Sequence, residues 1–279
     1  MQNTHRQNIR RNDRLAAMTR ILTSSPNRVI TLSHFSELFG AAKSTLSEDI
    51  DILANTMATF ELGRLDTVTG AAGGVRYRPA MTRGAALDFV QSVANRLAER
   101  GRVLPGGFLY MADILSMPNL VEKMGAIMAG EFYSDEPDFV LTMETKGIPV
   151  ALMAAKALGV PLVIARRDSK VYEGPAVNIN YLSGSAGRIE TMSLSRRAVK
   201  EGQRALIVDD FMKAGGTAKG MIDMMREFSV AVVGLCVVIA TAGPERKRLE
   251  GAKALMIMDE VDDERDSALI RPAGWLMEK

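Results

Sequence analysis

Apolar segments and helical stripes alternate along the chain from residue 138 onward. Apolar runs of the kind found in strands buried on both faces of a sheet occur at 138–142, 161–165, 205–208, 230–239 and 255–258. Apolar positions at helical spacing fill two of the intervals between these runs, at 150–158 and 218–228. Because strands alternate with helices, the pattern predicts an α/β fold whose mainly parallel sheet carries helices on both faces.

Upstream of this region the pattern changes to short helices followed by a hairpin. Helical stripes of apolar residues cover 15–22, 32–39 and 46–57. Gly40 suits the C-terminal cap of the second helix, and Thr45 and Glu48 have the spacing of a capping box at the start of the third. Two short helices around a glycine-containing turn form a helix-turn-helix pattern, in which the last of these helices is the recognition helix.

A β-hairpin is predicted directly after the recognition helix. Its strands, 64–69 and 75–79, flank the glycine-rich turn 70–74, and Arg76 and Arg78 share one face because they alternate with apolar residues. A hairpin in this position is the wing of a winged helix, and its arginines would contact the DNA backbone or minor groove. A solvated hairpin would show the same alternation, so the prediction depends on the order of the elements.

The residues at the start of the recognition helix are of types that contact DNA. Lys43 carries a cation and Ser44, Thr45 and Ser47 carry short hydroxyls, which can reach phosphates and base edges. Plain helix capping by the serine and threonine cluster is the alternative. Because acids follow at once, we expect only the N-terminal tip of the helix to enter a major groove; these acids are Glu48, Asp49 and Asp51.

Residues 204–220 hold the strongest chemical motif of the chain. The apolar run is followed by the adjacent acids Asp209 and Asp210, by the small-residue turn Ala214–Thr217, and by a helix from Ala218. A glycine turn before a helix N-terminus presents N–H groups and a positive dipole end to an anion, and the threonine hydroxyl can add a hydrogen bond. The acids suit sugar hydroxyls, so the motif predicts a ribose 5-phosphate site. An ordinary strand-to-helix turn is the alternative.

A second polar loop, 145–149, leaves the run at 138–142 at its carboxyl end, the edge of a parallel sheet at which ligands bind. Lys146 and Gly147 in this loop can meet a second phosphate group. A solvated lysine in a turn would look the same.

The string from the apolar strand through the acid pair to the AGGT turn resembles the phosphoribosyl pyrophosphate (PRPP) binding motif of type I phosphoribosyltransferases. It departs from that motif at Phe211 and at Lys213, where catalytic members usually carry a small residue. Lys213 places a cation at the mouth of the phosphate loop. The resemblance therefore implies binding of a phosphorylated ligand and puts turnover in doubt.

Nearly the whole chain resembles the purine operon repressors of Gram-positive bacteria, in which a winged-helix domain is fused to a phosphoribosyltransferase-like domain. Beyond the central motif, the stretches that carry this resemblance are FSELFGAAKSTLSEDI, TGAAGGVRY, LPGGFLYMADIL, ETKGIP and INYLSGSAGRIETMSLSRR. The resemblance implies a winged-helix DNA-binding domain over residues 1–80 and a PRPP-binding regulatory domain over residues 81–279. It also implies a homodimer that binds operator DNA and represses purine biosynthesis and salvage genes.

The same resemblance implies roles for individual residues. The acid pair would hold the ribose, the turn at 214–217 the 5-phosphate, and the loop at 146–147 the pyrophosphate, with Tyr110 (or Phe108) bordering the ligand. The implied PRPP or nucleotide contacts are Asp209, Asp210, Phe211, Met212, Lys213, Ala214, Gly215, Gly216, Thr217, Lys146, Gly147 and Tyr110. PRPP, with or without Mg²⁺, would lower DNA affinity, and guanosine tetraphosphate-type nucleotides would compete for the pocket as corepressors.

Charge is distributed unevenly, although the net charge is only +2. Residues 1–28 hold six arginines and one acid, whereas the chain from residue 81 onward holds 25 basic and 26 acidic residues. A basic block on a near-neutral body indicates that the first domain meets a polyanion. Basic residues that border the predicted flexible loop at 183–188 could extend this surface. The predicted DNA contacts are Arg10, Arg11, Arg14, Lys43, Ser44, Thr45, Ser47, Arg76, Arg78, Arg188 and Arg196.

Composition narrows the class of protein. A hydrophobic content of 47% with 24% charged residues is ordinary for a soluble globular protein, and no apolar run approaches the roughly 20 residues that cross a bilayer. The N-terminus lacks the apolar core of a secretory signal, and the single cysteine, Cys236, cannot form an internal disulfide. These features predict a cytoplasmic protein without a membrane partner.

Catalytic machinery is hard to assign. His5 and His34, the only histidines, both lie in the first domain, and no cysteine and histidine cluster has the spacing of a metal site. The sequence therefore predicts no catalytic residue, no catalytic cofactor and no resident metal. An active phosphoribosyltransferase that uses an acid such as Glu144 is the main alternative, and a sensor whose first domain binds protein is another.

Overall fold

A computed structural model of the chain describes residues 9–70, 73–104, 108–168, 174–183, 188–243, 251–262 and 267–278. The chain divides into two units, one containing the residues up to Met81 and the other nearly all of the chain from Thr82 onward. Each unit has its own apolar core. Parts of the sequence predictions lie outside the described residues: His5, the turn at 71–72, the glycines 106–107, the side chain of Phe108 and the loop residues 184–187.

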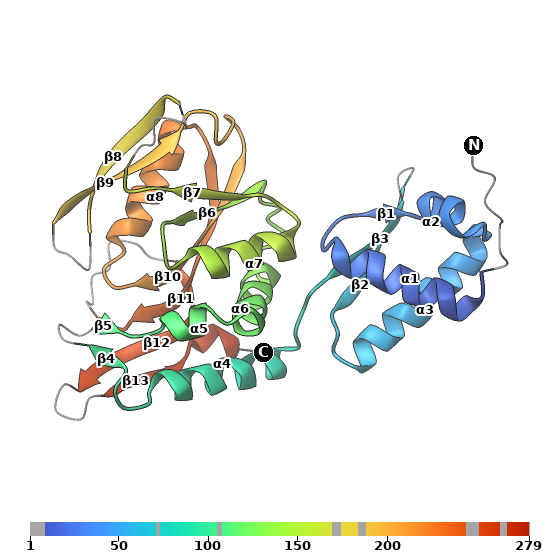
Figure 1. The fold of residues 1–279 in the computed structure, drawn as a ribbon, viewed down its shortest axis with the longest axis horizontal. Helices are drawn as coiled ribbons and strands as arrows, with labels where there is room; N and C mark the ends of the chain where they lie inside the picture. Colours follow the sequence, from blue (N-terminus) through green and yellow to red (C-terminus); the bar gives the residue numbers. More distant parts are fainter. Residues whose placement is uncertain are drawn as a thin grey trace. The chain divides into compact units, whose positions relative to one another are not determined.

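The first unit packs helices against a small antiparallel sheet (Figure 1). The strands are ordered β1-β3-β2, and the hairpin predicted after the recognition helix is the pair β2–β3. This arrangement confirms the winged helix-turn-helix. In chain order the elements are α1 (Arg11–Ser24), β1 (Ile30–Thr31), α2 (Leu32–Phe39), α3 (Lys43–Thr59), β2 (Arg64–Val68) and β3 (Gly74–Arg78).

The apolar stripes read from the sequence form the core of this unit. Buried residues of all three helices meet Val75 and Tyr77 of β3. Gly40 ends α2 in the left-handed conformation, with φ 65°, which glycine adopts at little cost. The capping-box prediction at Thr45 is wrong, because α3 begins one turn earlier, with Ala42 at its N-cap and no side-chain cap.

The second unit is built on a mainly parallel sheet, ordered β13-β12-β11-β10-β6-β7 among the described strands (Figure 1). Only the edge pair β12–β13 is antiparallel. The helices are α4 (Arg83–Leu97), α5 (Ala112–Leu115), α6 (Pro118–Gly130), α7 (Ile148–Leu158) and α8 (Gly216–Glu227). The strands are β4 (Val103–Leu104), β5 (Phe108–Leu109), β6 (Phe139–Met143), β7 (Leu162–Ala165), β8 (Ala176–Leu182), β9 (Ile189–Ser195), β10 (Arg204–Met212), β11 (Ala231–Thr241), β12 (Lys253–Asp262) and β13 (Ser267–Pro272).

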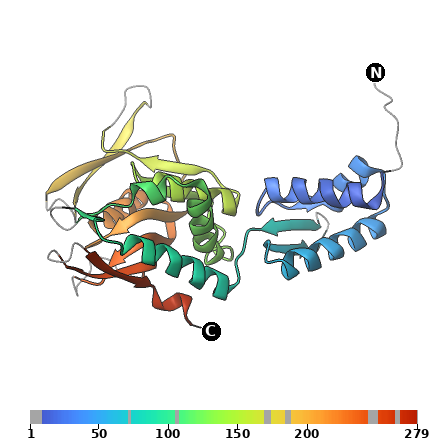
Figure 2. The same cartoon turned by 60° about the horizontal axis from the view of Figure 1, so that its bottom comes forward.

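Helices cover both faces of this sheet, as predicted (Figure 2). The chain passes from β6 through α7 to β7 in one direction along the sheet, and from β10 through α8 to β11 in the other. Right-handed crossovers in opposite directions place their helices on opposite faces. In agreement, Ile207 of β10 packs in one core with Met221 and Met224 of α8, whereas its neighbour Val208, equally buried, lies outside that core.

The antiparallel hairpin β8–β9 covers α8 (Figure 1). It confirms the strand predicted at 177–181, where inward and outward residues alternate. Backbone hydrogen bonds between Arg166 and Ser193 join the end of β7 to β9. The hairpin is thereby tied both to the sheet and to the helix that follows the glycine turn.

Strand β10 is longer than its apolar run. It continues to pair with β11 through Asp209 and Met212, and α8 starts at Gly216, two residues before the predicted Ala218. The acid pair therefore lies on the strand and not after it. The apolar run stops at Val208, while backbone pairing with β11 continues as far as Met212.

The C-terminal stretch, irregular in sequence, forms the edge strand β13 and a short 3-10 helix, Gly274–Leu276. Since β13 runs antiparallel to β12, it leads the chain away from the carboxyl edge of the sheet, and the Trp275 indole donates a hydrogen bond to the carbonyl of Ala254 near the start of β12.

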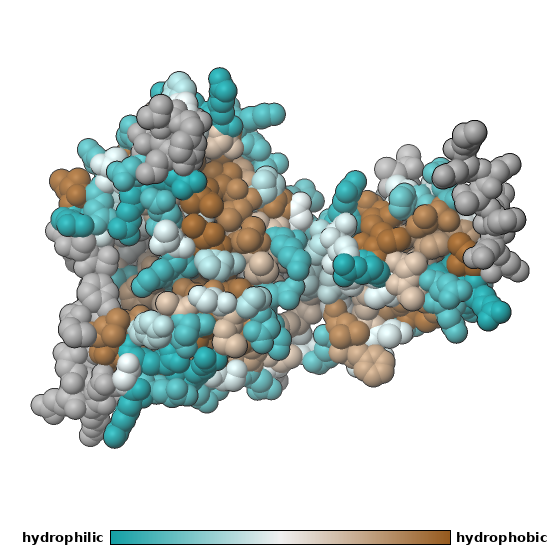
Figure 3. All heavy atoms as spheres, in the orientation of Figure 1, coloured by the Kyte–Doolittle hydropathy of each residue, from teal (hydrophilic) through white to brown (hydrophobic). Residues whose placement is uncertain are grey.

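In the part of the chain that the structure describes, no helix combines the length and apolar character that crossing a membrane requires. On the face drawn in Figure 3, hydrophobic residues gather in patches that hydrophilic residues surround. Large apolar side chains do reach the surface, among them Phe60 and Leu62 in the turn from α3 to β2.

Candidate functional site

The two predicted ligand loops meet at the centre of the sheet. Strands β6 and β10 are parallel neighbours, with Leu141 opposite Ile207, and both end at the same edge. They are also the neighbours from which the chain leaves in opposite directions, which makes their carboxyl ends the switch point where α/β sheets bind ligands. The acid pair of β10 and the Lys146 loop after β6 are therefore brought together.

Gly147 lies directly against the first acid. A Cβ atom at this position would be 2.4 Å from the Asp209 Oδ1 atom and 2.5 Å from the Thr142 Oγ1 atom. A side chain here would have to displace the Asp209 carboxylate or the Thr142 hydroxyl, so glycine allows the loop its close approach to the acid pair. Sequence reasoning proposed Gly147 for phosphate contact and missed this packing role.

Thr142 is a further residue that sequence reasoning missed. Its hydroxyl is fully buried and has no hydrogen-bond partner among the described residues. Buried hydroxyls without a partner are uncommon, because the lost hydration is not replaced. The available signal was a hydroxyl-bearing residue inside the otherwise apolar run FVLTM.

The surroundings of the acid pair disfavour the ionised form of both carboxyl groups. Burial, and secondarily the charge of Asp210, raise the pKa of Asp209 well above its ordinary value. Burial also raises the pKa of Asp210, against the opposing effects of the Asp209 hydrogen bond and the Lys146 charge. A ligand that supplies hydroxyl donors or a cation would stabilise the ionised pair.

The turn after β10 is shaped for an anion. Gly215 is the N-cap of α8 and has φ 75°, a conformation that favours glycine, and Gly215 and Gly216 are both buried. A helix leaves its first N–H groups for an external acceptor, and its dipole favours negative charge there. Lys213 is exposed beside this turn, and its carbonyl accepts a hydrogen bond from Thr241.

The remaining predicted ligand residues differ in how well their positions suit contact with a ligand. Phe211 is half-buried, but Met212 is buried in the core with α8, so its side chain is not a ligand contact. Tyr110 is exposed after β5, and none of the contacts of the described residues brings it to the acid pair. Glu144 follows β6, and its carboxylate accepts a hydrogen bond from the Arg167 N–H group. That carboxylate holds the end of β7, which disfavours it as a proton-transfer group.

Substituting Gly147 tests the close approach of the two loops. We expect Gly147→Ala to displace the Asp209 carboxylate and to weaken binding of a sugar phosphate by at least about tenfold, the loss of one charged hydrogen bond. Isothermal titration with PRPP measures it. Gly130→Ala, at a helical glycine with open space around it, is the matched control. Unchanged affinity in Gly147→Ala would contradict the packing described above.

The side chains at the N-terminal tip of the recognition helix are accessible for contact with DNA. Lys43, Ser44 and Ser47 are exposed and Thr45 is half-buried at the start of α3. The alternative role of the cluster, capping of α3, is wrong because the N-cap residue Ala42 has no side-chain cap. These side chains form the first part of a candidate nucleic-acid interface.

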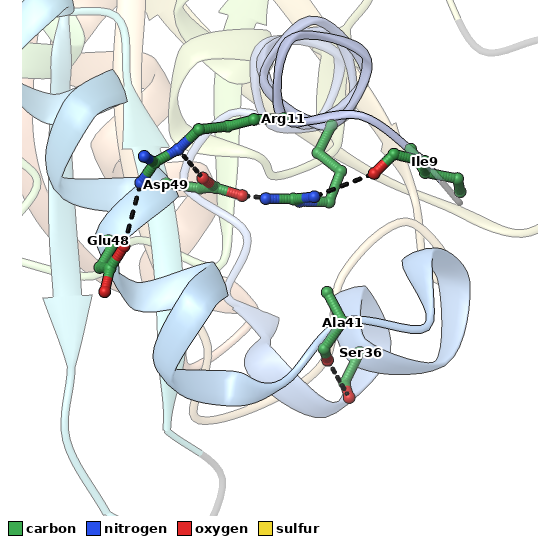
Figure 4. A network of polar contacts seen from close by, with 7 residues as sticks. Ile9, Arg11, Ser36, Ala41, Glu48 and Asp49 are labelled. Carbon is green, nitrogen blue, oxygen red and sulfur yellow. Dashed lines mark hydrogen bonds and ion pairs between the residues drawn. The ribbon is translucent and has the colours of Figure 1, made fainter.

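Two arginines predicted to contact DNA are instead internal partners of Asp49 (Figure 4). Asp49 is fully buried, and its two carboxylate oxygens accept hydrogen bonds at 2.8 Å from the Nε atoms of Arg11 and Arg14. Burial opposes this ion pair, but the hydrogen bonds from Arg14 and Arg11 prevail and lower the pKa of Asp49. The triad joins α1 to α3, and because Arg14 is largely buried in this ion pair, the structure disfavours Arg14 as a DNA contact.

Arg11 remains half-exposed and also contacts Glu48 at 3.1 Å, whereas only 11% of the Arg14 side chain is exposed. Arg10 precedes α1 and is exposed. Three N-terminal arginines were predicted to contact DNA. Of these, Arg10 is the one that is exposed and has no partner in α3 among the described contacts.

The wing carries a group of arginines around one acid. As predicted, Arg76 and Arg78 lie on the face of β3 opposite the core. Arg78, however, is buried, donates to the Asn27 side chain at 3.0 Å and lies 2.9 Å from Asp66, so it holds the wing together and is not a DNA contact. Arg64, which pairs with Asp66 at 2.7 Å and is 60% exposed, was missed and is better placed to meet a phosphate.

The second unit presents basic side chains at both ends of β9. Arg188 is 74% exposed and pairs with Glu190 at 3.3 Å, and Arg196 is also exposed. These positions agree with the predicted basic surroundings of the hairpin.

Together, a winged helix-turn-helix unit and a parallel α/β unit with an acid pair at its switch point define a winged-helix protein with a phosphoribosyltransferase-type domain. Residues 10–79 match the family model "Bacterial purine repressor, N-terminal", and residues 111–265 match the phosphoribosyl transferase domain. The chain belongs to the family of bacterial purine repressors.

Individual relatives agree with this family. The chain is 43% identical over 267 residues to the "Purine biosynthesis transcriptional repressor PurR" of Bacillus subtilis (strain 168), covering 96% of this chain and 94% of that one. It is 39% identical to the "Purine biosynthesis transcriptional activator PurR" of Lactococcus lactis (strain IL1403), covering 91% and 94%. The crystal structure of adenine phosphoribosyltransferase from Rhodothermus marinus shares the fold of the second unit, with a TM-score of 0.52, 23% identity, and coverage of 60% of this chain and 97% of that chain.

Proposed function

We propose that this protein represses transcription of purine biosynthesis and salvage genes by binding operator DNA, and that PRPP binding releases it from the operator. The observation that carries the proposal is the pair of buried Asp209 and half-buried Asp210 beside a glycine turn and a helix N-terminus. These groups match, in order, the ribose hydroxyls and the 5-phosphate of PRPP. The relative from Bacillus subtilis, named as a repressor, supports the direction of regulation.

In this proposal each part of the site binds one part of PRPP. The acid pair accepts hydrogen bonds from the ribose hydroxyls, and the start of α8 with Thr217 binds the 5-phosphate. Lys146 and the backbone at Gly147 face the pyrophosphate, while Lys213 adds a positive charge at the mouth of the turn. Guanosine tetraphosphate-type nucleotides would occupy the same site as corepressors, since they also present phosphate groups.

A magnesium ion fits the site as a companion of PRPP. Mg²⁺ prefers carboxylate and phosphate oxygens and usually binds through one or two carboxylates plus phosphates. Asp209 and Asp210 supply such oxygens, and no larger group of metal-ligating side chains occurs among the described residues. When bound, the ion would neutralise the pyrophosphate and ease ionisation of the acid pair.

Release from DNA follows from linkage. If PRPP binds more tightly to the form that does not hold DNA, it shifts the protein toward that form, and DNA weakens PRPP binding by the same factor. A homodimer would present two recognition helices to a two-fold related operator. Action on chromosomal operators implies a cytoplasmic protein.

One assay separates repression from catalysis. Labelled purine-promoter DNA is titrated with the protein, with and without PRPP, and purine bases plus PRPP are then assayed for pyrophosphate release. We expect operator binding that PRPP weakens, and no pyrophosphate release. Steady nucleotide formation would establish an active phosphoribosyltransferase instead, and DNA affinity unaffected by PRPP would contradict the proposed regulation.

Transcription from the same promoter decides the sign of the regulation. We expect less transcript when the protein is added and recovery on addition of PRPP. An increase in transcript would place the protein with the relative named as an activator.

We further propose that basic side chains of the second unit extend the DNA-binding surface. Arg196→Glu is expected to weaken operator binding and to reduce the slope of log affinity against log salt by about 1, as expected when a phosphate contact is lost. Arg226→Glu, which makes the same charge change at a side chain 71% exposed at the end of α8, serves as the control. Equal affinities and salt slopes in both variants would remove Arg196 from the interface.

A further inference from the structure

Thr142 of β6 carries a hydroxyl that the ligand-free fold does not use. The residue is fully buried between the core residues Leu141 and Met143, and its Oγ1 atom has no hydrogen-bond partner among the described residues. Such a group destabilises a protein, because the hydrogen bond to water that it loses on folding is not replaced. Valine has nearly the same shape and would not carry this cost. The hydroxyl therefore needs an explanation other than the stability of the ligand-free protein.

The position of the Thr142 hydroxyl connects it to the candidate ligand site. A Cβ atom placed on Gly147 would be 2.5 Å from the Thr142 Oγ1 atom and 2.4 Å from the Asp209 Oδ1 atom. Both oxygens therefore border the same small space beside Gly147. This space lies at the carboxyl ends of β6 and β10, where the loop that contains Gly147 approaches the acid pair.

The Asp209 carboxylate can accept a further hydrogen bond. Its Oδ1 atom accepts one from the Asp210 N–H group at 3.0 Å, and a carboxylate offers about four acceptor positions in all. A threonine hydroxyl has one proton to donate, and that of Thr142 has no acceptor among the described residues. An unused donor and an acceptor with remaining capacity thus lie around one space.

A bound sugar phosphate would make this donor useful. In the proposed function, ribose hydroxyls donate hydrogen bonds to the acid pair, and these bonds are strong when the acceptor is a charged carboxylate. They also depend on the direction in which the carboxylate points. A hydroxyl that donates to Asp209 from the β6 side would fix that direction, and a rotation of the Thr142 hydroxyl with a small shift of the carboxylate would bring the two together.

Resting on the proposed function, we propose that Thr142 is a positioning residue of the sugar-phosphate site. When PRPP is bound, the Thr142 hydroxyl donates a hydrogen bond to the Asp209 carboxylate and holds it toward the ribose hydroxyls. In the ligand-free protein the same hydroxyl is unpartnered and lowers stability. Strand β6 thereby contributes a residue of its own to the site, in addition to the loop that follows it.

Thr142→Val tests this role, because it removes the hydroxyl and nearly keeps the shape. Without ligand, the variant is expected to unfold at the wild-type temperature or above, since an unpartnered buried hydroxyl is lost. It is expected to bind PRPP at least about tenfold more weakly, the effect of losing a hydrogen bond to a charged group. Thr142→Ser keeps the hydroxyl and should bind PRPP more tightly than Thr142→Val. Calorimetric unfolding and isothermal titration with PRPP in the presence of Mg²⁺ measure the two quantities.

Thr241→Val is the matched control for stability. Thr241 is also a buried threonine, at the end of β11, but its hydroxyl donates to the carbonyls of Lys213 and Gly243. Its replacement takes the donor from these carbonyls and should lower the unfolding temperature. If Thr142→Val is destabilised in the same way, or does not fold, the inference is overturned, because the Thr142 hydroxyl would then already have a partner such as a buried water molecule.

The PRPP titrations separate this inference from the proposed function. If the wild-type protein does not bind PRPP, the proposed function fails and the inference fails with it. If wild type binds PRPP and Thr142→Val binds it equally well, only the inference is overturned. The same holds if Thr142→Ser binds as weakly as Thr142→Val, or if Thr142→Ala, whose smaller side chain cannot crowd Asp209, keeps the wild-type affinity.

Discussion

Asp49→Ala is expected to destabilise the winged-helix unit by about 3–5 kcal/mol and to abolish operator binding. Removing one partner of a buried ion pair has effects of this size because the other partner is left charged and without compensation. Here the partner left in that state is Arg14, of which only 11% is exposed. With the link between α1 and α3 lost, the recognition helix would no longer be held in place. Calorimetric unfolding and operator titration measure the two effects.

Glu48→Ala is the matched control for this experiment. Glu48 is the neighbouring acid and contacts the same Arg11 at 3.1 Å, but its side chain is 69% exposed. Exposed ion pairs contribute little, so its loss should leave the unfolding temperature unchanged. Equal effects of the two substitutions would show that burial of Asp49 does not govern the stability of the unit.

The contribution of Asp49 also has a defined dependence on pH. Its pKa is lowered in the folded protein, so its stabilisation is fully present above the value of an unfolded aspartate, about 3.9, and is lost as the pH falls through the folded value. Acid unfolding of the winged-helix unit should therefore begin below about pH 4. Asp49→Asn should remove this part of the acid transition.

Asp209→Asn is expected to leave the ligand-free protein as stable as wild type, or more so, while it weakens PRPP binding at least about tenfold. The buried carboxyl lies beside Asp210 and against Gly147, and a neutral amide of the same shape removes the unfavourable charge. The loss of affinity follows because an amide is a poorer acceptor for ribose hydroxyls than a carboxylate. Calorimetry and PRPP titration measure the two quantities.

The sign of the pH effect here is opposite to that of Asp49. The pKa of Asp209 is raised in the folded protein. The destabilisation that its ionisation causes is therefore absent below the unfolded pKa of about 3.9 and grows as the pH rises toward the folded pKa. The stability of Asp209→Asn relative to wild type should therefore increase with pH over that window. A variant that unfolds several degrees earlier than wild type at neutral pH, or one that still responds fully to PRPP, would contradict this account.

Periodicity in the sequence was enough for the main helices and strands and their order. The stripes at 15–22, 32–39 and 46–57 and the apolar runs from residue 138 became the helices and strands of both units, because burial of one face or of both faces leaves a local trace. The glycine turn and acid pair were also readable, since they are contiguous in the chain. The lengths of the strands were harder to predict. Strand β10 continues past Val208 because its backbone pairing with β11 does not depend on apolar side chains.

Residue roles that depend on partners distant in sequence could not be read in this way. Arg14 looks like any other arginine of a basic N-terminus, and only the packing of α1 on α3 brings it to Asp49, 35 residues away. Arg78 alternates with apolar residues in the way expected of a solvated side chain. In the structure it is buried, donates a hydrogen bond to Asn27 and pairs with Asp66.

The amino-acid order alone determined that this chain makes a winged helix followed by a parallel α/β unit with a phosphate-type turn, because these features are written in neighbouring residues. The tertiary structure decided which charges face outward and why a side chain at position 147 would collide with Asp209. These features depend on how segments distant in the sequence pack together, and the neighbours of a residue in the chain do not indicate which side chains it will contact.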